Sequence, residues 1–383
     1  MKKILVLLSL ALVIIGLVSC GEATGADPNG VNAGKETTHK ATIEIENYGI
    51  IELDLYGKEA PVTVVNFANL ANSGFYNGLT FHRIIEGFMM QGGCPNGNGS
   101  GGSGKNITGE FSANGSKNSI SHVRGVISMA RSGAQNYDYY YYNTASSQFF
   151  IVHEESTFLD GNYAAFGMVT SGMDVVDDVC TSVSVTDGNG TVEKENQPII
   201  KSISVTCVSD DFKEKTPTVT HTASIEIEGH GTITLELYGN IAPITVENFE
   251  KLANQGFYNG LTFHRIIKDF MMQGGCPKGD GTGDSGTDIK GEFLLNGIYN
   301  SISHVRGVVS MARGNEPDSG SSQFFIVHKD SPHLDYNYAA FGRVTDGMDI
   351  VDKICTEAEP TDSNGSIAKE NQPVIKSITV TKK

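Results

Sequence analysis

The chain has 383 residues, 39% of them hydrophobic and 19% charged, which is the balance of a folded globular protein long enough for two domains. Its formal net charge of −16 at pH 7 argues against a nucleic-acid partner, because phosphates would repel so acidic a chain. The 45 glycines indicate many tight turns and favour a β-rich fold.

The first residues have the pattern of an export signal. Lys2 and Lys3 precede an apolar run over residues 4–18, which is too short, and too one-sided in its flanking charge, for a membrane span. Leu17-Val18-Ser19-Cys20 resembles a bacterial lipobox, in which the cysteine is lipidated and becomes the mature N-terminus. Ordinary secretion with cleavage elsewhere is the alternative.

This pattern predicts a signal peptide over 1–19 and a lipid anchor at Cys20. We expect residues 20–38, which show no apolar period, to form a flexible tether. The protein would then lie in the cell envelope, lipid-anchored to the outer face of the cytoplasmic membrane or in the periplasm.

The next elements follow from hydrophobic periodicity. Residues 42–46 and 51–55 alternate between polar and apolar and predict two paired strands around a turn. A helix is expected next, with Pro61 near its start, Thr63 as its N-cap and Gly74 at its end. A second helix is expected near residues 173–179, and short strands between glycine-rich loops make up the remainder.

The sequence then repeats itself. Residues 74–85 recur unchanged as 256–267, an offset of 182 positions, whereas residues 146–153 recur at an offset of 175. The first copy therefore carries seven extra residues, which fall in the Tyr137–Tyr142 region. The predicted domains are 39–208 and 222–383, joined by a charged, proline-bearing linker over 209–221.

Cysteine usage leaves the redox state open. The five cysteines beyond Cys20 include two pairs at equivalent repeat positions and no C-x-x-C motif. A disulfide in each domain and a pair of buried thiols in each domain are both compatible with this pattern. The five are Cys94, Cys180, Cys207, Cys276 and Cys355.

Two motifs resemble cofactor sites without meeting their requirements. The glycines at 97, 99 and 102 match a dinucleotide fingerprint, but no long βαβ unit surrounds them, and Asn106 stands where a phosphate loop needs Ser or Thr. The calcium-loop-like start at Asp280 lacks the required later residues. With no metal-spaced Cys/His group, the sequence predicts no nucleotide, no metal and no cofactor.

Three strings recur in both copies and carry the strongest signal. They are 81–93 (FHRIIEGFMMQGG), 128–131 (SMAR) and 147–151 (SQFFI). Together they resemble the hallmark strings of the cyclophilin family over nearly all of 41–207 and 223–381. The resemblance implies a mostly β fold: two tandem closed eight-stranded antiparallel barrels, each capped by two helices. It also implies a peptidyl-prolyl cis/trans isomerase that acts on proline-containing unfolded or partly folded polypeptides and assists protein folding.

Matching positions carry over the family's site residue by residue. The catalytic residues would be Arg83 and Arg265. The substrate-binding residues would be Phe88, Met89, Gln91, Ala130, Gln148, Phe150, Phe158, Leu159 and Tyr163 in the first domain, and Phe270, Met271, Gln273, Ala312, Gln323, Phe325, His333, Leu334 and Tyr338 in the second.

Two positions depart from the family pattern. The family's frequent tryptophan is Phe158 in one copy and His333 in the other, and its frequent histidine is Tyr163 or Tyr338. The more polar His333 predicts weaker binding in the second domain. Cyclosporin sensitivity is open for both, because many family members bind the drug partly through that tryptophan.

The chemistry fits an arginine without a triad. Rotation about an X-Pro bond breaks amide resonance, at a barrier of roughly 20 kcal/mol, but transfers no atom. The twisted proline nitrogen regains a lone pair, and a guanidinium aimed at it favours the twisted form over both planar isomers.

Two other functions remain open. One is a non-catalytic peptide-binding or chaperone lipoprotein on the same scaffold, an alternative with more weight for the second domain. The other is a structural surface lipoprotein whose repeats serve attachment. The tyrosine-rich stretch 137–142 would add aromatic contacts to a client peptide in one interpretation and form a plain surface loop in the other.

Overall fold

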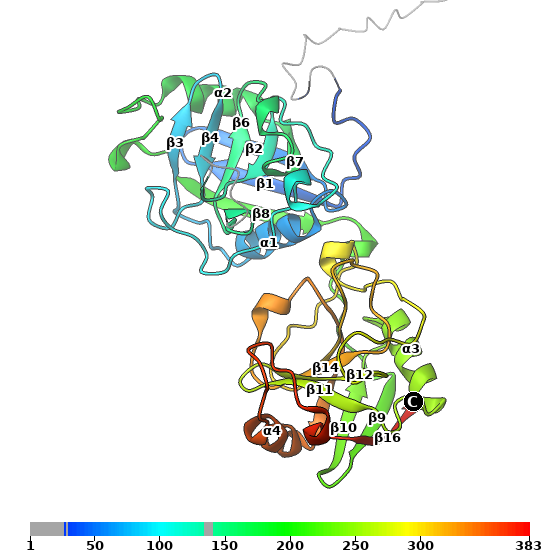
Figure 1. Ribbon diagram of the computed structural model, residues 1–383. Helices are drawn as coiled ribbons and strands as arrows, with labels where there is room; N and C mark the ends of the chain where they lie inside the picture. Colours follow the sequence, from blue (N-terminus) through cyan, green and yellow to red (C-terminus); the bar gives the residue numbers. More distant parts are fainter. Residues whose placement is uncertain (1–26, 28–29, 134–140) are drawn as a thin grey trace, which may run out of the picture.

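The computed structural model describes residues 27, 30–133 and 141–383. The predicted signal peptide and the lipidation site Cys20 lie outside these residues. The described chain forms two bodies of similar design, one coloured blue to green and the other green to red (Figure 1). No helix in the described ranges combines the length and the apolar character needed to cross a bilayer.

The first body is built on one antiparallel sheet of eight strands, in the order β3-β4-β6-β5-β7-β2-β1-β8. The predicted first strand pair is confirmed, since β1 pairs with β2 from His39↔Leu55 to Ile45↔Gly49. The strands are β1 (His39–Ile45), β2 (Gly49–Leu55), β3 (Phe81–Ile85), β4 (Met89–Gly92), β5 (Val126–Met129), β6 (Phe149–Val152), β7 (Ala164–Ser171) and β8 (Ile200–Cys207).

The second body repeats this sheet in the order β11-β12-β14-β13-β15-β10-β9-β16. The strand order is the same because the sequence motifs that form each strand recur in the same order. The strands are β9 (His221–Ile227), β10 (Gly231–Leu237), β11 (Thr262–Ile267), β12 (Met271–Cys276), β13 (Val308–Met311), β14 (Phe324–Val327), β15 (Ala339–Asp346) and β16 (Ile375–Lys382).

The expectation of closed barrels is wrong. Each sheet is curled but open, with β3 and β8 as the edge strands of the first. Isolated bridges link the β3 edge to the segment that precedes β8, at Thr80↔Ile199 and Arg83↔Thr191. Pro198 precedes β8 and has no N–H to donate, so a continuous ladder cannot extend through it.

Within the described residues four α-helices accompany the sheets, two in each domain as predicted: α1 (Pro61–Asn72), α2 (Met173–Ser182), α3 (Pro243–Asn254) and α4 (Met348–Glu357). The predicted apolar face of α1 is buried, and Phe67 packs edge-on against Phe149 of β6 at 5.4 Å. Helix and sheet thus share one aromatic core in each domain.

The predicted N-cap of α1 is wrong. Helix α1 begins at Pro61, so Thr63 lies inside its first turn, and the N-cap residue Ala60 makes no side-chain bond. The buried carboxylate of Glu110 instead accepts hydrogen bonds from the N–H groups of Val62 and Thr63, at 2.9 and 2.8 Å. Burial raises the pKa of Glu110 to about 7, although these hydrogen bonds act to lower it.

Residues 32–38, expected to be part of a flexible tether, lie against the first domain. The side chain of Asn32 is buried and exchanges two hydrogen bonds with the backbone of Ser121. Lys35 pairs with Glu59 at 2.9 Å, and Thr37 donates to Asp54 at 2.9 Å. Polar contacts hold this stretch, which explains why it has no apolar period.

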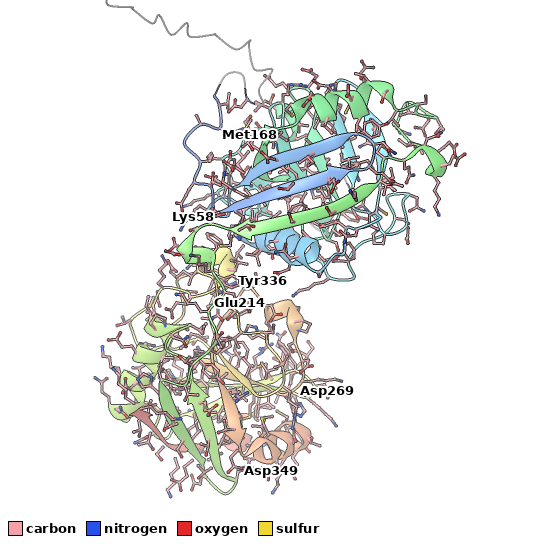
Figure 2. The ribbon with its side chains drawn as sticks, turned by 180° about the vertical axis from the view of Figure 1, so that it is seen from behind. Lys58, Met168, Glu214, Asp269, Tyr336 and Asp349 are labelled. Atoms are coloured by element: carbon pink, nitrogen blue, oxygen red, sulfur yellow. The ribbon has the colours of Figure 1, made fainter. Side chains whose placement is uncertain are left out.

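The two domains also contact each other. The linker begins with the 3-10 turn η5 (Asp210–Phe212), and the Phe212 ring packs on His39 of the first domain at 5.6 Å. Leu294 of the second domain is fully buried against the first-domain core. Tyr336 lies at the same junction (Figure 2).

The five cysteines of the described ranges are free thiols.

Candidate active site

Arg83 lies on β3, where it pairs in register with Gln91 of β4. Its Nε donates to the carbonyl of Asn189 at 2.8 Å, and its Nη1 donates to Gln91 Oε1 at 3.4 Å. Partial burial lowers the pKa of Arg83, yet a guanidinium stays charged at neutral pH. Contacts on two sides therefore fix the direction of a permanent positive charge.

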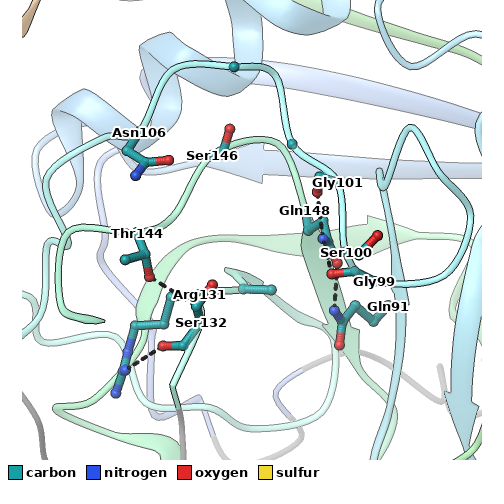
Figure 3. A pocket seen from close by; sticks show the side chains of 13 residues that line it. Gln91, Gly99, Ser100, Gly101, Asn106, Arg131, Ser132, Thr144, Ser146 and Gln148 are labelled. Atoms are coloured by element: carbon teal, nitrogen blue, oxygen red, sulfur yellow. Dashed lines mark hydrogen bonds between the residues drawn. The ribbon is translucent and has the colours of Figure 1, made fainter. Parts of the chain in front are cut away.

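A chain of glutamines connects Arg83 to a glycine-rich loop. Gln91 Nε2 donates to Gln148 Oε1 at 2.9 Å, and Gln148 Nε2 donates to the carbonyls of Gly99 and Gly101 at 2.8 and 2.7 Å. Figure 3 shows these bonds along one wall of the pocket. The loop thereby fixes the position of the Gln148 side chain, and Gln148 fixes that of Gln91. Gln91 in turn accepts the hydrogen bond from Arg83.

An apolar cluster separate from the domain core lies beside the arginine. It includes six of the predicted substrate-binding residues: Phe88, Met89, Ala130, Phe150, Leu159 and Tyr163. Met89 Sδ is 3.9 Å from Arg83 Nη1, so charge and apolar surface are in direct contact. Phe158, 70% exposed, stands at the rim with its ring 5.5 Å from that of Phe88.

The second domain repeats this geometry. Arg265 donates to the Asn364 carbonyl at 2.7 Å and to Gln273 at 3.3 Å, and its guanidinium lies 6.0 Å from the Phe270 ring centroid. The ring of His333 is 5.3 Å from that of Phe270, where the first domain has Phe158. The equivalent apolar cluster contains Phe270, Met271, Ala312, Phe325, Leu334 and Tyr338.

The second glutamine chain is also complete. Gln273 donates to Gln323 at 2.9 Å, and Gln323 donates to the carbonyls of Gly281 and Gly283 at 2.9 and 2.8 Å. Every residue predicted for either site is thus placed beside its own arginine, in its apolar cluster, in its glutamine chain or at its rim.

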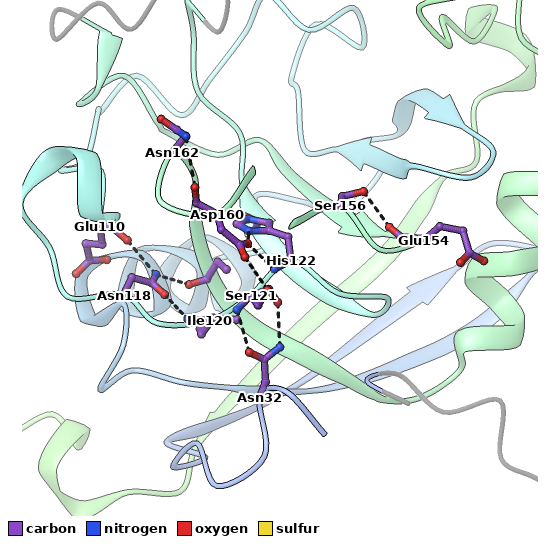
Figure 4. A network of polar contacts seen from close by, with 12 residues as sticks. Asn32, Glu110, Asn118, Ile120, Ser121, His122, Glu154, Ser156, Asp160 and Asn162 are labelled. Atoms are coloured by element: carbon purple, nitrogen blue, oxygen red, sulfur yellow. Dashed lines mark hydrogen bonds and ion pairs between the residues drawn. The ribbon is translucent and has the colours of Figure 1, made fainter. Parts of the chain in front are cut away.

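A buried polar network that the sequence analysis missed supports the first cluster (Figure 4). His122 lies 2.7 Å from Asp160 through Nδ1 and 2.9 Å from Ser128 through Nε2, and its ring stacks on Phe150 at 6.1 Å. Ser128 is completely buried, so this serine cannot reach a substrate as a nucleophile. The only sequence signal was the recurrence of the Ser-His-Val-Arg string.

The charge state of Asp160 fits a supporting role. Burial opposes its ionisation, but hydrogen bonds from His122 and Ser121 outweigh burial and lower its pKa. Asp335 holds His304 in the same way, 3.1 Å away, and its pKa is lowered as well. In both domains the network fixes the histidine beneath the site's phenylalanine.

A polar groove of about 380 Å³ continues from Gln91 and Gln148 along the glycine-rich loop. Its far wall includes Arg131, whose guanidinium lies 4.9 Å from the Tyr163 ring and 5.4 Å from the Tyr142 ring. Tyr142, the last residue of the tyrosine-rich stretch, is buried against Phe111, whereas residues 137–140 lie outside the described ranges. The second domain has an equivalent groove of about 350 Å³.

Comparison with known proteins identifies one family. The family model of cyclophilin type peptidyl-prolyl cis-trans isomerase matches residues 40–205 and 222–380. Peptidyl-prolyl cis-trans isomerase B of Bacillus subtilis is 48% identical over 144 residues, which are 38% of this chain and 92% of the relative. A Helicobacter pylori peptidyl-prolyl cis-trans isomerase is 45% identical over 146 residues, 38% of this chain and 86% of the relative.

Among solved structures, a cyclophilin type isomerase of Cryptosporidium parvum has 28% identity and a TM-score of 0.38, covering 43% of this chain and 99% of that one. The same protein has been crystallised in the presence of the dipeptide Ala-Pro. The matches to the family model cover most of the sequence, in two copies. The chain belongs to the cyclophilin-type peptidyl-prolyl cis-trans isomerase family.

Proposed function

We propose that both domains are active isomerases and that Arg83 and Arg265 carry the catalysis. The observation that supports this most is the position of each guanidinium, held on one side by a backbone carbonyl and facing the apolar cluster on the other. A proline ring seated on that cluster brings its nitrogen toward the arginine. Arginine suits this role because its charge is permanent and its donors are rigidly oriented.

Catalysis then follows because the site binds the twisted transition state more tightly than the planar cis and trans isomers. The planar amide has a delocalised nitrogen lone pair, whereas the twisted amide has a localised one that accepts a hydrogen bond. The guanidinium therefore stabilises the twisted form more than either planar isomer. Lowering the barrier by about 7 kcal/mol would raise the rate by roughly five powers of ten.

The remaining residues hold the substrate during the rotation. Phe88, Met89, Phe150 and Leu159 provide the apolar surface for the proline ring. Gln91 and the backbone near Ala130 would hold the peptide on one side of the bond while the other side turns. In the second domain, exposed His333 replaces an apolar rim residue, which supports weaker binding there rather than loss of turnover.

The protease-coupled isomerisation of a short Xaa-Pro peptide by the full chain tests these roles. We expect Arg83→Ala to remove the first domain's share of kcat/KM, Arg265→Ala the second's, and the double variant nearly all of it. Circular dichroism and the urea midpoint of each variant control for folding. A double variant that folds normally and retains full turnover would exclude the arginine mechanism.

The clients are proposed to be exported polypeptides, reached from a lipid anchor at Cys20. The lipobox-like string and the preceding signal pattern support this location. Metabolic labelling with a radioactive fatty acid in a bacterial host tests it. Label should enter the wild-type chain and be absent from Cys20→Ala, whereas equal labelling of both would refute the anchor.

A further inference from the structure

A cavity of about 460 Å³ lies between the two domains. Its first-domain wall is the end of the glycine-rich loop and the residues after it, among them Lys105, Asn106 and Thr108. Its second-domain wall is the short 3-10 turn η7 (Pro332–Leu334) and the residues that follow, including His333 and Asn337. The lining mixes amide and hydroxyl groups with apolar side chains such as Val62 and Ile107.

This cavity adjoins the groove of the first site. Gly104 and Asn106 line the interdomain cavity and also line the groove that begins at Gln91 and Gln148. A chain leaving the first site along that groove therefore reaches the edge of the interdomain cavity at these two residues.

The cavity also reaches the rim of the second site. His333 lines the cavity while its ring lies 5.3 Å from that of Phe270, a member of the second apolar cluster. Leu334, the next residue, belongs to the same cluster. The turn η7 thus has one side toward the cavity and the other toward the second proline pocket.

The walls of this path are held together across the domain boundary. Lys105 Nζ is 3.4 Å from Asp335 Oδ2 and 4.9 Å from the Tyr336 ring centroid. Tyr336 and Leu294 pack against the hydrophobic core cluster of the first domain. Asp335 also fixes His304 below the second site, so the interdomain contact and the second site share one carboxylate. These contacts connect the loop at the first site to the turn at the second.

We infer that one extended polypeptide segment occupies both sites at once and that the stretch between its two prolines lies in the interdomain cavity. The inference rests on the proposed function of the two sites. The amide and hydroxyl groups of the lining suit a peptide backbone, and Lys105 and Asp335 neutralise each other, so an uncharged spacer fits best. The substrate class is therefore an unfolded chain with two Xaa-Pro bonds separated by a polar, uncharged spacer.

Two linked contacts on one chain should bind more tightly than either alone. Once the first proline is bound, the second is held at a high effective concentration near its site, and gains of 10² or more are ordinary for matched spacers. Affinity should therefore pass through a maximum as the spacer is lengthened, because a short spacer cannot span the cavity and a long one dilutes the second proline.

Titration of the full-length chain with fluorescent peptides tests the inference. The peptides carry two Ala-Pro units joined by Gly/Ser/Asn spacers of graded length, and the control peptide has the same length with one proline replaced by alanine. We expect the best two-proline peptide to bind at least tenfold more tightly than the control. A benzoyl-phenylalanine in mid-spacer should crosslink to residues 104–108 or 332–337.

A cavity-filling variant gives the matched test. Thr108 lines the cavity and not the groove of the first site, and its side chain is partly exposed. Thr108→Trp should abolish the two-proline advantage while leaving the turnover of single-proline peptides unchanged, and Thr108→Val should keep both.

Several results would overturn the inference. They are equal affinity of the two peptides, an advantage that survives Thr108→Trp, and crosslinks that fall elsewhere. Absence of single-proline turnover in the wild-type chain would instead overturn the proposed function. Failure of the inference and failure of the proposed function are therefore distinguishable.

Discussion

Replacing Gln91 with leucine should lower the kcat/KM of the first domain about tenfold. Gln91 Oε1 accepts the Arg83 Nη1 hydrogen bond at 3.4 Å, a long contact. Hydrogen bonds to charged groups contribute roughly 1.5–3 kcal/mol, and the length of this one places it near 1.5 kcal/mol. That free energy corresponds to about a factor of ten in rate if the bond serves to aim the guanidinium.

Gln148→Leu should cost less, roughly threefold, because Gln148 acts on the arginine only through Gln91. The double variant should be no slower than Gln91→Leu alone, since both substitutions interrupt one chain of contacts. The equivalent pair in the second domain, Gln273 and Gln323, should behave in the same way in an Arg83→Ala background.

The assay is the protease-coupled isomerisation of a single-proline peptide in an Arg265→Ala background, which leaves the first site as the source of turnover. Urea unfolding of each variant controls for a loss of stability. Unchanged kcat/KM in Gln91→Leu, or losses that multiply in the double variant, would show that the glutamine chain does not position Arg83.

Three further predictions concern the supporting structure. Burial raises the pKa of Glu110 from 4.5 to about 7, so the folded state holds the Glu110 proton more tightly than the unfolded chain does. The stability that this protonated carboxyl contributes is therefore complete below pH 4.5 and is lost as the pH rises through 7. Urea unfolding should therefore show wild type losing stability relative to Glu110→Gln between these pH values, and parallel curves would contradict the assignment. Ser128→Ala should keep most of the kcat while lowering the free energy of unfolding by about 1–2 kcal/mol, because it leaves His122 Nε2 without its buried partner; abolished turnover in a folded variant would contradict the structural role. His333→Trp, measured in an Arg83→Ala background, should lower the KM of the second domain several-fold by making its rim apolar, and a raised KM would argue against His333 as the weak point of that site.

Local patterns predicted the elements, and the resemblance to the cyclophilin family supplied the candidate site residues. Alternation of polar and apolar residues predicted the β1–β2 pair, and helical spacing predicted the face of α1 that Phe67 buries. Both features depend on residues that are close together in the sequence, and hydrophobic periodicity reports on such residues. The residues beside Arg83 were named because the recurring strings resemble the hallmark strings of that family.

Long-range polar contacts were not predictable in this way. Glu110 caps α1 from 47 residues further along the chain, and a single glutamate carries no sign of which N–H groups it will meet. The buried His122 and its partly exposed partner Asp160 are likewise 38 residues apart. The docking of residues 32–38 depends on side chains such as Asn32 pairing with backbone, for which composition is uninformative.

The barrel closure and the domain junction show two other limits. Family likeness suggested a closed barrel, but closure depends on backbone pairing around Pro198, a detail of geometry rather than of residue type. The charged linker indicated a domain boundary but carried no information on contacts across it. Lys105 and Asp335 meet across that boundary, and each of these residues looks like an ordinary surface charge in the sequence.

The most direct test of the arginine mechanism separates binding from rotation. Exchange NMR of an Ala-Pro peptide with the full-length Arg83→Ala, Arg265→Ala double variant measures both in one sample. If the arginines act on rotation alone, the peptide resonances still shift on binding, while cis/trans exchange falls close to the uncatalysed rate. Exchange as fast as with the wild-type chain would contradict the arginine mechanism.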